Sequence, residues 1–176
     1  MGISLPIKNK TEIDAIKDLY RRKNQISELL MFTLAINTGI DLIDLLNLKV
    51  KDVKNKLYLS IDKNKAIPLN DEILELIKQV IIGRKPNEYL FSNTNGNKLH
   101  RASVFYSFKN VCSELGLSDK YSAASWRKTF AYHYYMKYKD LSFLQWLFNQ
   151  TNIKMALKFI DEDENMNLRY REGVCL

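Results

Sequence analysis

The residues best suited to chemistry lie in the segment Ser125–Ala131, where Arg127 and Lys128 open an apolar stretch typical of a helix. The planar guanidinium of an arginine can bind two oxygens of a phosphate, and a helix start adds its own preference for anions. We therefore expect Arg127, aided by Lys128, to contact a phosphate or another anion. The alternative is a structural salt bridge, for which Asp44 is the candidate partner.

A second group of cations crowds one short region of the chain. A phosphate contact is one interpretation of this group, and an ordinary solvated surface is the other. The same two interpretations, with the sign of charge reversed, apply to the acidic block of residues 161–164. The lysines concerned are Lys49, Lys51, Lys54, Lys56, Lys63 and Lys65.

Composition limits the class of protein. Lysine and arginine number 27 against 20 aspartates and glutamates, and the net charge of +7 suits a polyanionic partner. The hydrophobic content of 46% argues against disorder, and a length of 176 residues predicts one domain, residues 1–176. The sequence has no apolar run that could cross a bilayer and no signal-peptide pattern, so we expect no membrane partner and a cytoplasmic protein.

Metal and cofactor sites find little support in the sequence. Cys112 and Cys175 are too few and too far apart for a disulfide framework or a zinc site. His100 and His133 do not form a ligand pair at a useful spacing. We therefore expect no metal and no cofactor.

Hydrophobic periodicity predicts a mainly α fold with a small antiparallel β-sheet, an α+β class. The apolar residues at 57–61 and 66–69 alternate as in a hairpin, with a polar turn between them. A helix capped by Asn70 follows, and Thr11 is the predicted cap of the first helix. Further helices are expected at 25–37, around 42–46, 104–116, 124–138, 142–149 and 152–161, with a weak one near the C-terminus.

Three segments, in this order, resemble the C-terminal catalytic domain of the tyrosine recombinase (phage integrase) family. Residues 38–48 read T-G-I-D-L-I-D-L-L-N-L, which is similar to the family's T-G-L-R-I-S-E-L-L-x-L. The Arg127 segment resembles its H-x-L-R-H-T-F-A. Residues 144–160 match, without gaps, a pattern of the form I-Q-x-L-L-G-H-S-S-I-x-M-T-L-R-Y-I. The resemblance covers about residues 5–160.

The resemblance implies metal-free phosphoryl transfer on DNA. In active relatives a tyrosine oxygen attacks a DNA phosphate, while arginines and histidine-type donors stabilise charge on its oxygens. A hairpin lysine protonates the leaving 5′ oxygen. The positions that carry these roles fall here on Asp41, Lys63 or Lys65, Ala124, Arg127, Gln150 and Phe159.

Most of these positions are substituted. Asp41 places an anion where the family has its first arginine, and we interpret Asp41 as a helix N-cap instead. Either lysine of the hairpin could contact a phosphate or simply lie in an exposed turn. Gln150 can still donate a hydrogen bond, although most glutamines at such places belong to the polar surface.

Phe159 decides the expected mechanism. A phenyl ring has no hydroxyl, so no phosphotyrosine bond can form at this position. We expect its ring to pack in the core with Leu147, Ile153 and Met155. Tyr170 lies eleven residues further on and would need a different local architecture to replace the lost nucleophile.

We therefore expect a protein that binds double-stranded DNA on a degenerate recombinase fold without cleaving it, in a regulatory or accessory role on phage or other mobile-element DNA. The alternatives are an active recombinase with an unusual site, or a protein–protein module that self-associates through its tail, about residues 161–176. The sequence shows no N-terminal DNA-clamping domain, so the chain is either part of a longer protein or a free-standing relic. The candidate DNA contacts are Arg127, Lys128, Lys63, Lys65, Lys49 and Lys51.

Overall fold

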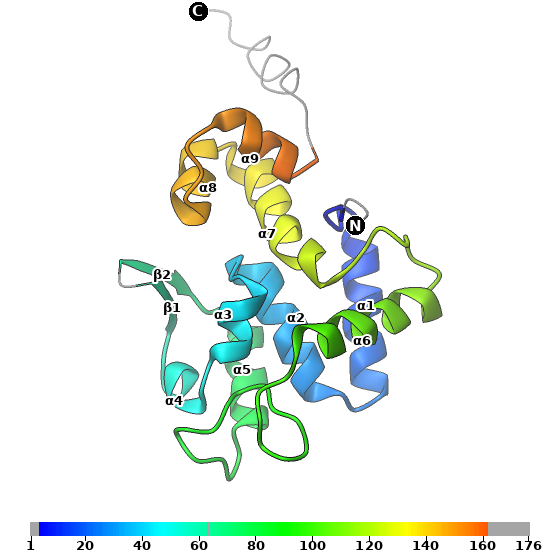
Figure 1. Cartoon of the computed structure of the whole chain (residues 1–176), viewed down its shortest axis with the longest axis vertical. Coiled ribbons are helices and arrows are strands. Elements are labelled where there is room, and N and C mark those ends of the chain that lie inside the picture. Colours follow the sequence, from blue (N-terminus) through cyan, green and yellow to red (C-terminus); the bar gives the residue numbers. More distant parts are fainter. Residues whose placement is uncertain (1–3, 63, 162–176) are drawn as a thin grey trace, which may run out of the picture.

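The computed structural model describes residues 4–62 and 64–161 of the chain. This part is mainly helical and carries a two-stranded antiparallel sheet, so the predicted fold class is confirmed (Figure 1). The elements are α1 Lys10–Arg22, α2 Ile26–Thr38, α3 Leu42–Asn47, α4 Val50–Val53, β1 Tyr58–Asp62, β2 Lys65–Pro68, α5 Asp71–Val80, α6 Arg101–Glu114, α7 Ala123–Tyr138, α8 Leu141–Phe148 and α9 Ile153–Phe159.

Helix α2 lies in the middle of the molecule and contacts α1, α3, α5 and α7. It is apolar on almost every side, as expected of a helix that neighbours surround. Its Phe32 packs against Phe108 of α6 and Trp126 of α7, with ring centroids 5.8 Å away in both cases. The main core therefore forms around α2.

Helix α7 belongs to two apolar clusters. Trp126, near its start, lies in the main core, whereas Ala131 and Tyr135 lie in a second cluster with Leu144 of α8 and Leu157 of α9. Figure 1 shows α7 leading away from the main body and carrying α8 and α9 at its far end. The position of the C-terminal helices therefore depends on how α7 is anchored.

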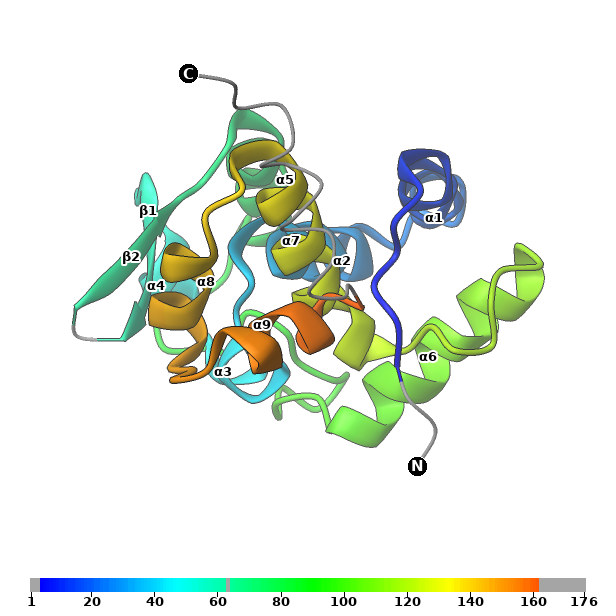
Figure 2. The same cartoon turned by 90° about the horizontal axis from the view of Figure 1, so that it is seen from above.

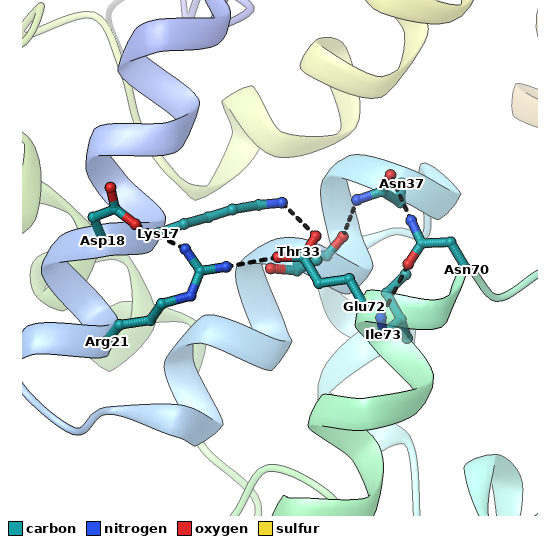
Figure 3. A network of polar contacts seen from close by, with 8 residues as sticks. All are labelled: Lys17, Asp18, Arg21, Thr33, Asn37, Asn70, Glu72 and Ile73. Atoms are coloured by element: carbon teal, nitrogen blue, oxygen red, sulfur yellow. Dashed lines mark hydrogen bonds and ion pairs between the residues drawn. The ribbon is translucent and has the colours of Figure 1, made fainter.

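Charged and amide side chains join α1, α2 and α5 (Figure 3). Glu72, in the first turn of α5, accepts hydrogen bonds from Lys17 at 2.7 Å and Arg21 at 2.8 Å, both on α1. Asn70 caps α5, as predicted, and its amide also donates to Asn37 of α2 at 3.3 Å. These contacts fix the helix that follows the hairpin against the main body.

The hairpin pairs Tyr58 with Pro68 at its open end and is irregular between Ser60 and Asp62, near the turn. The side chains of β2 alternate between buried and exposed. Lys65 and Ile67 are on the buried face. A lysine on the buried face of a strand needs a specific partner, because burying an unpaired charge is costly.

The segment before α1 runs along α7. The Ile7 amide donates to the Thr129 hydroxyl at 2.9 Å, and the Ile7 carbonyl lies 3.0 Å from Nε2 of His133. Lys8 donates to the Asp161 carbonyl at 3.0 Å and lies 3.2 Å from its carboxylate. This segment therefore ties α7 to the residues just after α9.

One prediction about local structure is corrected, and one short helix was not predicted. Helix α1 begins at Lys10 and is capped by Asn9, whose side chain accepts the amide hydrogen of Thr11 at 2.9 Å, so Thr11 is not the cap. The lysine-rich stretch contains the short helix α4, which was not predicted because four residues are too few to show a helical period. The weak helix expected near the C-terminus lies outside the described residues.

Replacing Gly39 with alanine should destabilise the protein. Gly39 ends α2 with a φ of +65°, and an added Cβ would lie 2.6 Å from Cδ1 of Phe130 on α7. We expect a loss of about 2–4 kcal/mol in the free energy of unfolding, from left-handed backbone strain together with the steric clash. Chemical denaturation would measure it.

Gly83→Ala is the matched control for this substitution. Gly83 has a similar φ of +71°, but no atom of the described residues lies within 4 Å of its added Cβ. The control should lose about 1–2 kcal/mol, from backbone strain alone. Equal losses for the two variants would contradict the close approach of α2 to α7.

Candidate functional site

The two carboxylate oxygens of Asp41 have different partners. Oδ1 accepts the amide hydrogen of Ile43 at 2.9 Å and so caps α3, as the sequence predicted. Oδ2 accepts a hydrogen bond from Nη1 of Arg127 at 3.1 Å. Asp41 therefore links the start of α3 to the first turns of α7. Its carboxylate is the anion that Arg127 binds in this structure.

The guanidinium of Arg127 also lies over an aromatic ring. It is 4.6 Å from the centre of the Phe148 ring, and Phe148 in turn lies 5.1 Å from the ring of Phe159. Its Nε is buried and has no hydrogen-bond partner among residues 4–62 and 64–161. The guanidinium is thus held by one carboxylate and one ring, with donor capacity left over.

Lys65 reaches the same region from the hairpin. Its Nζ donates to Oδ1 of Asn149 at 2.6 Å and lies 5.2 Å from the centre of the Trp146 ring. Only 7% of the residue is exposed, so the expectation of a lysine in an exposed turn is wrong for Lys65. A charge-assisted hydrogen bond and a cation–π contact together offset part of the cost of its burial.

The turn between α8 and α9 connects these two cations. Phe148 covers Arg127, and the next residue, Asn149, accepts the hydrogen bond from Lys65. Asn149 has a φ of 53°, in the left-handed region that asparagine tolerates better than most residues. Both views place α8 beside the hairpin (Figure 2).

Three further predicted positions lie on α7 and in this turn. Ala124 is exposed at the start of α7, one turn before Arg127. Gln150 is half-buried, and its enclosed Oε1 has no hydrogen-bond partner among the described residues. The Lys128 ammonium donates to the Ser4 carbonyl at 2.6 Å and lies over the Phe159 ring at 5.6 Å.

The environment of Lys128 disfavours its charged form. Burial lowers the pKa of the ammonium below its ordinary value, and the nearby Asp161 carboxylate raises it in part. The ammonium contacts the segment before α1 and the ring of Phe159, where the resemblance places a nucleophile.

Comparison with known proteins assigns the family. The model of the phage integrase family matches residues 9–166. The chain belongs to the phage integrase family. It is 31% identical over 171 residues to the probable integrase/recombinase YoeC of Bacillus subtilis (strain 168), an alignment that covers 94% of this chain and 93% of YoeC. It is 24% identical to a probable integrase/recombinase of Acholeplasma phage L2, across 87% of this chain and 55% of that relative.

Solved structures of this family have the same fold. XerA recombinase superposes on all of this chain with a TM-score of 0.78 at 14% identity, across 66% of its own length. The Tn1549 transposon integrase, in complex with circular intermediate DNA, gives a TM-score of 0.79 at 16% identity, across 99% of this chain and 66% of its own. This chain thus matches YoeC over nearly the full length of YoeC, but spans only half to two thirds of the other relatives named here.

Placed in this family, most of the predicted centre comes together. Asp41, Arg127 and Phe159 are linked through direct contacts and Phe148, while Lys65 joins through Asn149. Lys63 and Tyr170 lie outside the described residues. The predicted DNA contacts Lys49 and Lys51 lie at α4, where Lys49 contacts the Tyr89 ring and Lys51 is exposed beside an open cavity.

Two expectations about contacts in the centre are wrong. The salt-bridge partner of Arg127 is Asp41, not Asp44, whose side chain is exposed. Phe159 packs against the second apolar cluster and Phe148, so its expected core packing is confirmed. Ile153 and Met155, two of its three expected partners, are 50% and 57% exposed and do not belong to the core, whereas Leu147 is buried.

Sequence reasoning missed the roles of Phe148 and Asn149. The signal was present, because these residues align with L-G in the family-like pattern L-L-G-H. Each replaces a smaller or apolar residue with a side chain that can engage a cation. Contacts between these residues and cations far away in the sequence appear only in the folded chain.

Two negative findings concern residues 4–62 and 64–161. No group of three or more histidine, cysteine, aspartate or glutamate side chains there is arranged to hold a metal ion. No helix in the same range is long and apolar enough to cross a membrane.

A double-mutant cycle should detect the Asp41–Arg127 pair in the free energy of unfolding. Both side chains are partly exposed, at 44% and 27%, so we expect a coupling of about 0.5–1 kcal/mol that decreases in high salt. The variants are Asp41→Asn, Arg127→Gln and the double substitution, measured by chemical denaturation.

The cycle of Asp44→Asn with Arg127→Gln is the control. Asp44 is an exposed acid on the same helix, and its coupling to Arg127 should be about zero. Equal coupling in the two cycles would show that Asp41 has no special relation to Arg127.

Proposed function

We propose that this protein binds double-stranded DNA and does not cleave it, and that it acts in the cytoplasm as a regulatory or accessory protein on phage or other mobile-element DNA. The observation that carries this proposal is the phenyl ring of Phe159 at the nucleophile position. Its ring packs on Phe148 and lies under the Lys128 ammonium, where the motif alignment places the nucleophile. A ring without a hydroxyl cannot attack phosphorus.

The case for DNA binding rests on the family and on charge. The Tn1549 integrase and XerH recombinase structures that share this fold are complexes with DNA. The net charge of +7 favours a polyanion, and three lysines around α4, Lys51, Lys54 and Lys56, are exposed. They are suited to contact phosphates, which positions a protein on DNA without reading its sequence.

The case against cleavage extends beyond Phe159. Arg127 is bound to Asp41, an anion at the position of the family's first arginine, and Ala124 carries no hydrogen-bonding group. A phosphate brought to Arg127 would meet the Asp41 carboxylate, and two like charges at about 4 Å repel by ~4 kcal/mol at an effective dielectric of 20. The clamp needed for a developing negative charge is therefore incomplete.

DNA binding should be steeply dependent on salt. We expect Lys51→Ala/Lys56→Ala to weaken binding and to reduce the slope of log affinity against log salt by about 2, since each phosphate contact contributes about 0.9. Fluorescence anisotropy with labelled duplex DNA, together with sequencing of bound genomic fragments, would measure affinity and specificity.

Lys10→Ala/Lys120→Ala is the matched control, because it removes the same charge from exposed positions. Helix α1, which begins at Lys10, lies on the opposite side of the molecule from α4 (Figures 1 and 2). This control should leave the slope unchanged. Absence of binding even at low salt would refute the proposed function and favour the protein–protein module.

Restoring a hydroxyl at position 159 should not restore cleavage. Phe159→Tyr leaves Asp41 and Ala124 in place, so we expect no covalent protein–DNA adduct on a nicked duplex, from either this variant or the unaltered protein. Denaturing gel electrophoresis would detect an adduct. One formed by the unaltered protein and lost in Tyr170→Phe would establish an active recombinase instead.

A further inference from the structure

The Arg127 side chain has the form of an oxyanion site that already holds a carboxylate. Nη1 donates to Oδ2 of Asp41 at 3.1 Å, and the Phe148 ring covers one face of the guanidinium. Nε is buried and finds no hydrogen-bond partner in the part of the chain that the structure describes. A guanidinium offers five donors, so this single bond leaves the group partly unsatisfied. The Arg127 side chain is 27% exposed, so an acceptor from solvent can reach the guanidinium.

We propose that the Asp41 carboxylate is a built-in occupant of this site, and that it keeps phosphate and sulfate oxyanions away from Arg127. The carboxylate is held in place because its other oxygen caps α3 by accepting the Ile43 amide hydrogen. A tethered anion in a fixed position competes strongly with a free one, since it has little freedom left to lose. This inference holds whether or not the protein binds DNA.

The second cation of this region, Lys65, is engaged by the Asn149 side chain. Lys65 is buried and donates to Asn149, one residue beyond the Phe148 ring that covers Arg127. An entering oxyanion would therefore meet an arginine already neutralised by Asp41 and a lysine already engaged. The exposure of Asp41 and Arg127, 44% and 27%, leaves the pair accessible from solvent. Removal of the carboxylate charge should accordingly open a site for a tetrahedral oxyanion.

Asp41→Asn is the informative variant. Asparagine keeps an oxygen that can cap α3, so it removes the charge while preserving the local structure. Isothermal titration with sodium sulfate and inorganic phosphate, at constant ionic strength adjusted with chloride, should show saturable binding at least about tenfold tighter than in the unaltered protein. Asp41→Ser, which also keeps a cap oxygen, should behave in the same way and serves if the asparagine variant does not fold.

Two controls identify the site. Asp44→Asn makes the same change of charge on the same helix at an exposed position and should not increase oxyanion binding. The double variant Asp41→Asn/Arg127→Gln should lose the gained binding, because the donors are gone.

Three results would overturn the inference. The first is an equal gain of oxyanion affinity in Asp44→Asn. The second is a gain of affinity in Asp41→Asn that persists when Arg127 is also replaced. The third is oxyanion binding by the unaltered protein as tight as that by Asp41→Asn. Failure to bind duplex DNA would refute the proposed function but leave these comparisons intact, so the two ideas can fail separately.

Discussion

The packing of α7 against α2 is the constraint on which the rest of the structure depends. Trp126 makes edge-to-face contacts with Phe32 and Phe108, which fixes the start of α7 in the main core. Arg127 is the next residue, so anchoring the tryptophan also determines where the guanidinium can reach. The far half of the same helix supports α8 and α9 through Ala131 and Tyr135. One helix therefore determines the position of Arg127 and the position of α8, whose last residue, Phe148, covers the guanidinium.

That constraint brings together charges that are distant in the sequence. Arg127 meets Asp41 across 86 residues, and Lys65 meets Asn149 across 84. In each case a side chain of the protein itself accepts a hydrogen bond from the cation. Partly exposed ion pairs add little to stability, about 0–1 kcal/mol, so their main effect is on what else the cations can bind. This internal pairing agrees with the proposal that the protein does not cleave DNA, because cations must be available to stabilise charge on a phosphate.

This fold carries other residue types at several of the positions where the motif alignment places the family's catalytic groups. The helices and hairpin that deliver the centre are retained, while the side chains at its key positions favour contacts within the chain. Fold alone does not determine activity, because activity depends on a few groups carried by the scaffold. Phe159 and Phe148 illustrate this, since together they form an aromatic pair beside the arginine without disturbing α8 or α9.

The sequence by itself determined the class of fold, most helices, the hairpin and the role of Asp41 as a cap. These features follow from local rules, namely the spacing of apolar residues and the hydrogen bonding of a side chain to amides a few residues away. The family motifs also placed Arg127 and Phe159 at positions that carry catalytic roles in the family. Only the tertiary structure decided that Asp41, rather than Asp44, binds Arg127, that Lys65 is buried against Asn149, and that Phe148 covers the guanidinium. The reason is physical: a cation takes whichever acceptor the packing of separate helices brings within hydrogen-bonding distance, and no local pattern encodes that distance.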